Sequence, residues 1–298
     1  MQQFRLLKDK ILSKLMLLFT LASVSLVFFI GIGLYYRSIP LLDKVSWTNL
    51  LGSSVWEPMK GLFGFFPFIM GTLWVTAIAI LIALPLCLLT AIYLSEYAST
   101  TVKRIIIPLV NLLSGIPPVI FGVWGVLFIV PFVGDYLAPH FIDFSTGYSV
   151  LAGGIVLAVM IFPLIVSIIS EVFNTIPKEL KDASLSLGAT KWETIKKVIL
   201  RKAMPGIIAA TVLAISRAFG ETIAVLMVCG NVPIAPKSVF DAGYPLPALI
   251  ANNYGEMLSI PLYDSALLFA AFLLFIIILI FNAVSRIILG RLERRMNG

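Results

Sequence analysis

The sequence predicts an all-α membrane protein that crosses the bilayer six times. Hydrophobic residues make up 60% of the 298 residues and charged residues only 12%, and the mean hydropathy is +1.03. Several uncharged runs exceed the roughly 20 residues that a helix needs to cross a ~30 Å hydrocarbon core. The basic residues lie beside these runs, which is typical of membrane orientation signals and argues against a nucleic-acid partner.

The first 60 residues are predicted to form one spanning helix and an external loop. Residues 15–36 carry no charge and follow a basic segment. A cleaved signal peptide is the alternative interpretation. The run is long for a signal peptide, and the Arg-Ser-Ile-Pro sequence at 37–40 offers no small-residue cleavage site. We therefore expect an uncleaved helix, followed by a mixed polar loop at 37–60.

The uncharged run at 61–95 is too long for one straight crossing, because as a helix it would measure about 52 Å at 1.5 Å per residue. Its first part, rich in Gly, Phe and Pro, is expected to lie along the membrane interface or to enter at a bend. The second span is then 71–95, with a kink at Pro85.

A proline-rich break is predicted inside the third uncharged run, 105–134. The sequence Ser-Gly-Ile-Pro-Pro at 114–118 removes two amide donors and disfavours continued helix. Broken backbone at membrane depth is tolerated only where protein or a water-filled cavity covers it. The break is therefore either a kink that aids packing or a part of a transport pathway.

The remaining chain is predicted to contain three more spans, at 145–170, 204–230 and 265–285. A charged loop at 171–203 precedes the fifth span, a loop at 231–264 follows it, and the chain ends in a basic tail. The single histidine, His140, is expected to be solvated rather than a metal ligand. Cys87 and Cys229 both lie in apolar runs, so neither a disulfide framework nor a metal site is expected.

The distribution of basic residues predicts the orientation. Of the 22 Lys and Arg residues, 17 lie in the N-terminal segment, the link at 96–104, the loop at 171–203 and the tail. Four lie in the three loops on the opposite side. By the positive-inside rule, both termini and the loop at 171–203 are predicted to be cytoplasmic.

The charged loop is predicted to fold as two short helices. Between 178 and 202 it carries seven basic and three acidic residues. Pro177 can begin a helix and Gly188 can end it, while residues 191–202 place apolar side chains at spacings of three and four. This pattern suits docking on a soluble partner, and a solvated connector is the alternative.

The fifth span carries two charges, Arg217 and Glu221, four residues apart. On a continuous helix they would lie one turn apart on one face, so we expect an ion pair, with Gly220 between them leaving room for close helix approach. Because each charge costs about 2.5–3.5 kcal/mol at mid-membrane, pairing would offset much of the expense. The pair is either structural or part of a pathway, because charged residues inside spanning helices usually face a cavity.

Two sets of motifs carry a family resemblance. Asp182-Ala183-Ser184, Gly188 and Val198-Ile199-Leu200 resemble the EAA motif of permease subunits of ABC importers, although Asp-Ala-Ser stands for Glu-Ala-Ala and Arg201 for the usual proline. The resemblance implies a coupling helix that fits a groove on the ATP-binding subunit. The implied ATPase-coupling residues are Leu180, Asp182, Ala183, Leu187, Gly188 and Ala189.

The second set is narrower and covers roughly 60–290. The segment 114–125, Gly71-Thr72 and the segment 217–222 resemble the phosphate-specific (Pst-type) ABC permeases, and the Trp-Gly ending at 124–125 points to the PstC-like subunit. This resemblance implies a type I ABC importer permease fold, with a permease core at 61–298 that includes the coupling loop 171–203. The implied anion pathway or gate residues are Arg217, Glu221, Thr222, Gly220 and Ser114.

The resemblance also implies partners. The chain contains no G-x-x-x-x-G-K-[ST] sequence, so ATP and Mg are expected on a separate PstB-like ATPase dimer, and this chain is not expected to be an enzyme. The other implied partners are a homologous PstA-like permease and an extracytoplasmic PstS-like phosphate-binding protein. The implied location is the cytoplasmic (inner) membrane of a bacterium or archaeon.

Three alternative functions stay open at this point. A permease for another oxyanion, such as molybdate, tungstate or sulfate, would share the same motifs. An ion-coupled secondary transporter would also carry intramembrane charges, but it would need no coupling loop, and no inverted repeat of broken helices is evident. An intramembrane enzyme would need a recognisable pair of His, Cys or Asp residues at span depth, which the sequence lacks.

Overall fold

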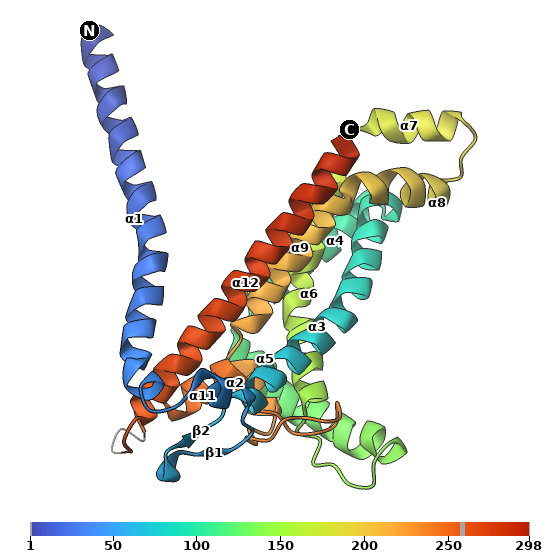
Figure 1. Cartoon of the computed structure of the whole chain (residues 1–298). Helices are drawn as coiled ribbons and strands as arrows, with labels where there is room; N and C mark the ends of the chain where they lie inside the picture. Colours follow the sequence, from blue (N-terminus) through green and yellow to red (C-terminus); the bar gives the residue numbers. More distant parts are fainter. Residues whose placement is uncertain (1, 257–259, 298) are drawn as a thin grey trace.

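The computed structural model describes residues 2–256 and 260–297, which are almost entirely helical. Six segments in this part of the chain are long and apolar enough to cross a membrane, as the sequence predicts: Lys8–Leu42, Phe66–Tyr97, Pro118–His140, Val150–Asn174, Lys191–Phe219 and Tyr263–Arg291. Five of them form a bundle, while the N-terminal helix α1 stands apart from it over most of its length (Figure 1).

The bundle is built from the following elements. The helices are α1 (Gln2–Leu42), α2 (Trp47–Gly52), α3 (Phe66–Ile92), α4 (Thr100–Ser114), α5 (Pro118–Trp124), α6 (Val150–Asn174), α7 (Lys178–Ser186), α8 (Lys191–Thr194), α9 (Leu200–Phe219), α10 (Ile223–Val228), α11 (Leu246–Asn253) and α12 (Tyr263–Asn297). Two strands, β1 (Trp56–Glu57) and β2 (Leu62–Phe63), pair antiparallel. Short 3-10 turns are η1 (Pro58–Lys60) and η5 (Ala138–His140), and π-helical turns are η2 (Tyr93–Tyr97), η3 (Gly125–Ile129), η4 (Phe132–Leu137) and η6 (Ile195–Ile199).

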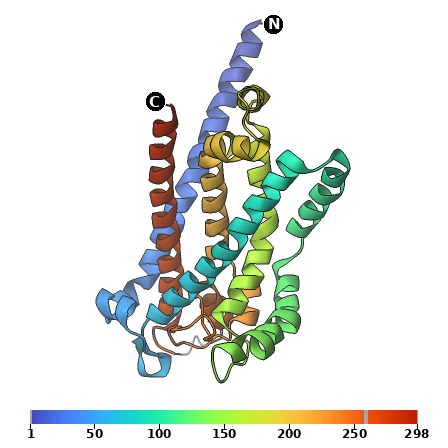
Figure 2. The same cartoon turned by 90° about the vertical axis from the view of Figure 1, so that its right-hand side faces the viewer.

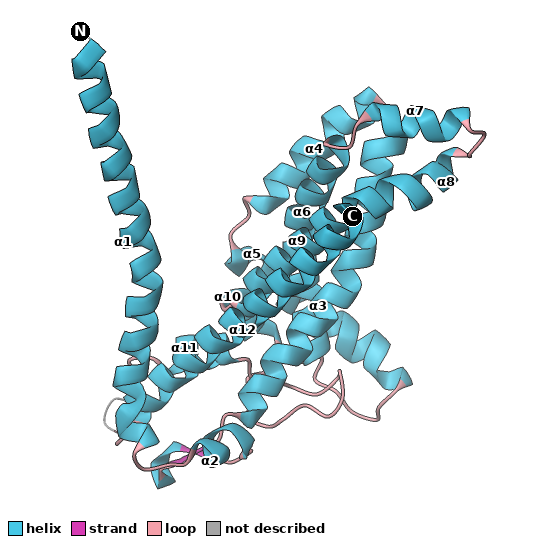
Figure 3. Cartoon of the chain, turned by 45° about the horizontal axis from the view of Figure 1, so that its top comes forward, coloured by secondary structure: helices cyan, strands magenta, loops and turns pink. Residues whose placement is uncertain are grey.

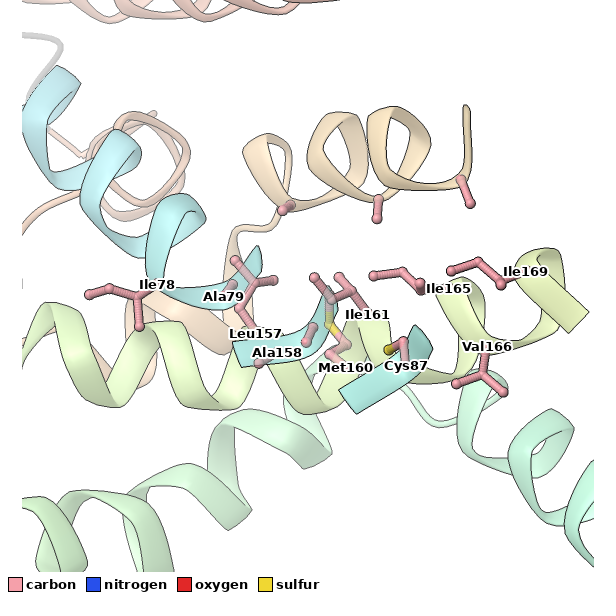
Figure 4. Close-up of a cluster of buried hydrophobic side chains, with 14 of the residues drawn as sticks. Ile78, Ala79, Cys87, Leu157, Ala158, Met160, Ile161, Ile165, Val166 and Ile169 are labelled. Carbon is pink, nitrogen blue, oxygen red and sulfur yellow. The ribbon is translucent and has the colours of Figure 1, made fainter. Parts of the chain in front are cut away.

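The core lies where α3 packs along α6. Ile78 and Cys87 of α3 belong to one buried cluster with Leu157, Ile161 and Ile165 of α6 (Figure 4). Gly154 of α6 faces Ile78 so closely that a Cβ there would collide with it. Small residues let membrane helices approach each other and gain van der Waals contact, and this close packing makes α3 and α6 the centre of the bundle.

A second cluster of apolar side chains lies at the end of the bundle that carries β1, β2, α2 and α11. Trp56 packs edge-on against Phe68, with ring centroids 4.8 Å apart, and Phe65 and Tyr263 are fully or nearly fully buried beside them. Edge-to-face aromatic contacts of this kind add to the burial of apolar area. They fix the start of α3 and the start of α12 together.

Several predicted boundaries are wrong. The helices α1 and α12 extend well beyond the predicted spans 15–36 and 265–285, and α3 begins at Phe66 rather than at 71. Hydropathy marks only the part of a helix that suits lipid, whereas the polar flanking residues are also good helix formers. Cys87 and Cys229 are both buried and free.

The two ends of the chain lie at the same end of the bundle as α7 and α8, and the β1–β2 pair lies at the opposite end (Figures 1 and 2). This arrangement is the one that an even number of spans requires. Which end faces the cytoplasm stays a prediction from the positive-inside rule.

Candidate functional site

The predicted helix–glycine–helix hairpin is present in the charged loop. The helix α7 ends at Ser186 with Leu187 as its C-cap, and the next residue, Gly188, adopts φ +83°. The amide of Gly188 donates to Leu185 O (3.0 Å) and that of Ala189 to Ser184 O (3.3 Å). These two bonds form a Schellman motif, which needs a left-handed residue and therefore favours glycine.

The helix α8 begins with a capping box. Thr190 Oγ1 accepts the amide hydrogen of Glu193, and Glu193 Oε2 accepts the amide hydrogen of Thr190. The π-helical turn η6 then connects α8 to α9, so the loop continues into the fifth span as one bent helix (Figure 3). Two residues of the predicted amphipathic stripe face inward, since Ile195 and Ile199 are each 1% exposed, whereas Trp192 at its start is exposed.

The tip of this hairpin is exposed and apolar. Leu187 is 89% exposed and Leu180 is 41% exposed, and no residue of α7 is buried. Asp182, Ala183 and Gly188 are exposed as well, while Ala189 is half-buried. The predicted coupling residues therefore share one projecting hairpin, and its surface is free within the described chain.

One charged contact of the hairpin was not predicted. Lys181 of α7 donates to Glu96 of η2, with 2.5 Å between Nζ and Oε1. The only available sequence signal was that Glu96 is the first charge after the long run 61–95. Its partner could not be deduced, because the two residues are 85 positions apart.

The predicted ion pair between Arg217 and Glu221 is wrong for this structure. The helix α9 ends at Phe219, with Gly220 as its C-cap, so residues 217 and 221 do not share one continuous helix. Within the described residues the Arg217 side chain is exposed and makes no hydrogen bond or ion pair. The Glu221 carboxylate instead accepts the amide hydrogen of Ala224 at 3.3 Å, in the first turn of α10.

Hydrogen bonds and a small cavity surround the break between α9 and α10. Thr222 Oγ1 donates to Gly220 O (3.2 Å). The side chains of Thr72, Thr76 and Glu221 border a cavity of about 10 Å³, roughly the room of one water. Thr72 Oγ1 also accepts the amide hydrogen of Leu246 (2.9 Å). This cavity is too small for an oxyanion, and Arg217 does not border it.

The proline break predicted at 114–118 is present, and the helix that follows it contacts the helix that follows α9. The helix α4 ends at Ser114, whose hydroxyl donates to Asn111 O (2.7 Å), and α5 begins at Pro118. The short helices that follow the two breaks, α5 and α10, pack together (Figure 3). At their contact, a Cβ on Gly122 would lie 2.5 Å from Met227 Sδ and 3.3 Å from Ala224 Cα.

The structure thus brings the two broken helices together, but it does not join all of the predicted pathway residues. No hydrogen bond or ion pair within the described chain links Ser114 to Arg217 or Glu221. What the two breaks share is the interface of α5 with α10.

The loop before α11, which lies beside α3, is held by polar contacts of its own. The hydroxyl of Tyr244 accepts hydrogen bonds from Asn252 (2.9 Å) and Asn253 (2.8 Å). Burial raises the pKa of Tyr244, more than these two bonds lower it. The backbone at Tyr244 lies 3.2 Å from where a Cβ of Gly71 would stand. Gly71 therefore permits the close approach of this loop to α3.

Comparisons with known proteins agree with this architecture. The family model described as binding-protein-dependent transport system inner membrane component matches residues 83–298. A probable ABC transporter permease protein, YqgH, of Bacillus subtilis is 41% identical over 79% of this chain and 74% of its own. A phosphate transport system permease protein, PstC, of Xylella fastidiosa is 36% identical over 82% and 79%. A probable PstC of Methanocaldococcus jannaschii is 34% identical over 88% and 87%.

Solved structures share the fold. A chain of a bacterial alginate ABC transporter in complex with a periplasmic protein superposes with a TM-score of 0.61 at 18% identity, covering 92% of this chain and 95% of its own. A chain of the inward-facing MetNI methionine ABC transporter gives 0.56 at 21% identity, covering 77% and 94%. The predicted type I ABC importer permease fold is thereby confirmed. With the family model matching more than half of its length, the chain belongs to the family of inner membrane components of binding-protein-dependent transport systems.

Proposed function

We propose that this chain is the PstC-like permease subunit of an ATP-driven importer of inorganic phosphate. The similarity to PstC proteins over most of the chain supports the substrate. Among the structural observations, Arg217 carries the proposal. An exposed guanidinium in a spanning segment is costly in lipid, so its unpaired state fits a surface that faces an anion pathway.

The anion pathway is proposed to run between this chain and a second, PstA-like permease. The cavity beside Glu221 is too small for phosphate, so a site built by one chain alone is not supported. Leu213 and Ala209 precede Arg217 by one and two turns of α9, and they line a groove of about 630 Å³ between α9 and α12. A second chain seated along this side would enclose Arg217. Gly220, Glu221, Thr222 and Ser114 would then form the backbone breaks that open and close the pathway.

The hairpin of α7 and α8 is proposed to dock on a PstB-like ATPase dimer, which would bind ATP and Mg. Exposed Leu180 and Leu187 supply the apolar contact, and the helix and turn are preorganised by the Schellman motif at Gly188. Exposed apolar side chains that gather in one patch often mark a protein–protein interaction site. On the opposite face, a PstS-like binding protein would deliver phosphate. This chain is then a transport subunit without a catalytic site.

The test is anion-stimulated ATP hydrolysis and uptake in the complex reconstituted in proteoliposomes. Phosphate, presented on the binding protein, is expected to stimulate hydrolysis and to accumulate in the lumen. Sulfate, molybdate and tungstate form the comparison arms, since a permease for another oxyanion is the second candidate and shares the family. Stimulation by one of these anions and not by phosphate would overturn the substrate assignment.

A further inference from the structure

The turn η2, which follows α3, is contacted by lysine side chains from three other helices. Lys181 of α7 pairs with Glu96 at 2.5 Å. Lys191 of α8 lies 4.4 Å from the centre of the Tyr97 ring, a cation–π contact. Lys103 of α4 donates to Ser95 O (3.2 Å). A π-helical turn alters the direction of the side chains that follow it, and here it presents Glu96 to the hairpin.

The pair of Glu96 and Lys181, called the Glu96/Lys181 pair below, differs from the other ion pairs in the described part of the chain. Its side chains are 10% and 21% exposed, whereas those of the pairs Glu57 with Lys60 and Glu193 with Lys197 are 43–72% exposed. The other two pairs join residues only three and four positions apart in the sequence. Exposed pairs contribute little. In a partly buried pair, the loss of one partner leaves the other charge incompletely hydrated, which costs more than it does at an exposed site.

The helix α7 has few other attachments to the bundle. None of its residues is buried, and Ser184 contacts Thr194 of α8 at 2.9 Å. A cavity of about 500 Å³ lies between α7, α8 and the end of α3, bordered by both members of the Glu96/Lys181 pair together with Lys178 and Leu185. Because this space is not packed, apolar contact alone would transmit a displacement of α7 poorly. The ion pair is the direct side-chain link from α7 to α3.

The helix α3 connects this link to the breaks. It runs without interruption from Phe66 into η2. At its other end, Thr72 and Thr76 border the small cavity beside Glu221. Glu96 follows Thr76 by twenty residues, which corresponds to about 30 Å of helix. Along this stretch α3 packs closely on α6 (Figure 4), which limits independent movement of its two ends, although Pro85 lies within it.

We propose that the Glu96/Lys181 pair is the mechanical link between the ATPase and the pathway. The pair transmits the displacement of α7 to α3, and α3 carries it to the break at 220–222. Glu96 and Lys181 are positioning residues, since neither touches the anion or the nucleotide. This inference rests on the proposed function, in which α7 docks on the ATPase.

Three variants test the link: Glu96→Gln, Lys181→Met and the neutral double variant. The measured quantities are the ATPase subunit that co-purifies with the permease and the phosphate taken up per ATP hydrolysed. The ratio is expected to fall about 10-fold in every variant, within the range of coupling energies between sites. The double variant is expected to be no worse than either single variant, because the pair acts as a unit.

The double variant keeps the test decisive if a single variant fails to assemble, since it leaves no lone buried charge. Normal uptake per ATP in an assembled double variant would show that the pair is only structural and would overturn the proposal. Lys178→Met is the matched control: Lys178 lies on the same helix and borders the same cavity, without an ion pair in the described chain. Its ratio is expected to equal that of the wild type.

The wild-type complex separates the two proposals. If its ATP hydrolysis does not respond to phosphate, the proposed function fails. If it responds, and the Glu96 and Lys181 variants respond with unchanged uptake per ATP, only the link fails. Lys181→Arg, which retains the charge, is expected to recover most of the ratio.

Discussion

Arg217 and Glu221 show how one glycine changes the meaning of two charges. Their spacing of four predicts an ion pair only while the helix continues between them. Gly220 ends α9, and Glu221 then accepts an amide hydrogen at the start of α10. The carboxylate of Glu221 thus binds a backbone amide, while the exposed Arg217 side chain is available to another partner. A phosphate oxyanion or an acid of the second permease would both satisfy it.

Charge removal at these two positions distinguishes a pathway residue from a structural pair. Arg217→Gln is expected to lower phosphate uptake about 10- to 100-fold without loss of assembly, because hydrogen bonds to charged groups contribute about 1.5–3 kcal/mol. Glu221→Gln keeps an acceptor for the Ala224 amide and is expected to have a milder effect. With no shared contact, the two effects should add in the double variant. Uptake normalised to assembled complex is the measurement.

Arg37→Gln is the control for this experiment, since Arg37 is an exposed arginine on α1, away from the breaks. Near-normal uptake by the double variant of Arg217 and Glu221 would contradict the pathway role. It would mean that the two charges do pair in the assembled transporter and that only a lone charge is harmful.

For single residues, the sequence shows which side chains are unusual better than it shows which partners they contact. The two intramembrane charges and the prolines of the first break could be picked out because they are expensive in lipid or interrupt a helix. Glu96 could not be assigned, because its partner lies 85 positions away and an acid next to a span is ordinary. The termination of α9 at a single glycine was also missed, since glycine is tolerated inside membrane helices.

At the scale of elements, the hairpin of α7 and α8 is the part that the sequence describes best. Its start at Lys178, after Pro177, its turn at Gly188 and its restart at Lys191 are all local features. Capping boxes and Schellman motifs are read from a few adjacent residues, so no tertiary information is needed. The π-helical turns η2 and η6 are the opposite case, because they arise where packing forces an extra residue into a helix.

Gly188→Arg is expected to leave membrane insertion intact and to uncouple the ATPase. The φ of +83° would cost a residue with a Cβ about 1–2 kcal/mol. The space around Gly188 is open within this chain, so the added bulk would obstruct only the docked partner. Gly188→Asn, which tolerates the left-handed conformation, is the matched control and should retain coupling. Normal ATPase co-purification and uptake by the Arg variant would contradict the docking role.

At the scale of the whole molecule, two short broken helices meet between long continuous ones. The long helices α3, α6 and α12 connect the hairpin end of the bundle to its opposite end. The short helices α5 and α10, which follow the two breaks, pack together. Breaks are tolerated only where lipid does not reach the freed backbone groups. The arrangement therefore concentrates deformable backbone in one region and leaves its surroundings rigid. The sequence showed the proline break but gave no sign that the helices after the two breaks are in contact. That contact is visible only in the fold.

The orientation of the molecule gives the last prediction. Cysteines introduced at Ser186 of α7 and at Lys237 of the loop before α11 should react with a membrane-impermeant maleimide from opposite sides. Both positions are exposed, and they lie at opposite ends of the bundle. In right-side-out vesicles only the cysteine at 237 is expected to react, and in inverted vesicles only the one at 186, because the basic loop is predicted to be cytoplasmic.

The background for this labelling is the Cys87→Ala/Cys229→Ala variant. Both native thiols are fully buried, and alanine fits beside Gly153, which already contacts Cys229 closely. This background should itself stay unlabelled from either side. Labelling of positions 186 and 237 from the same side would contradict the six-span arrangement. The reverse sidedness would keep the fold but place α7 outside the cell, where no ATPase could dock, and the proposed coupling would fall with it.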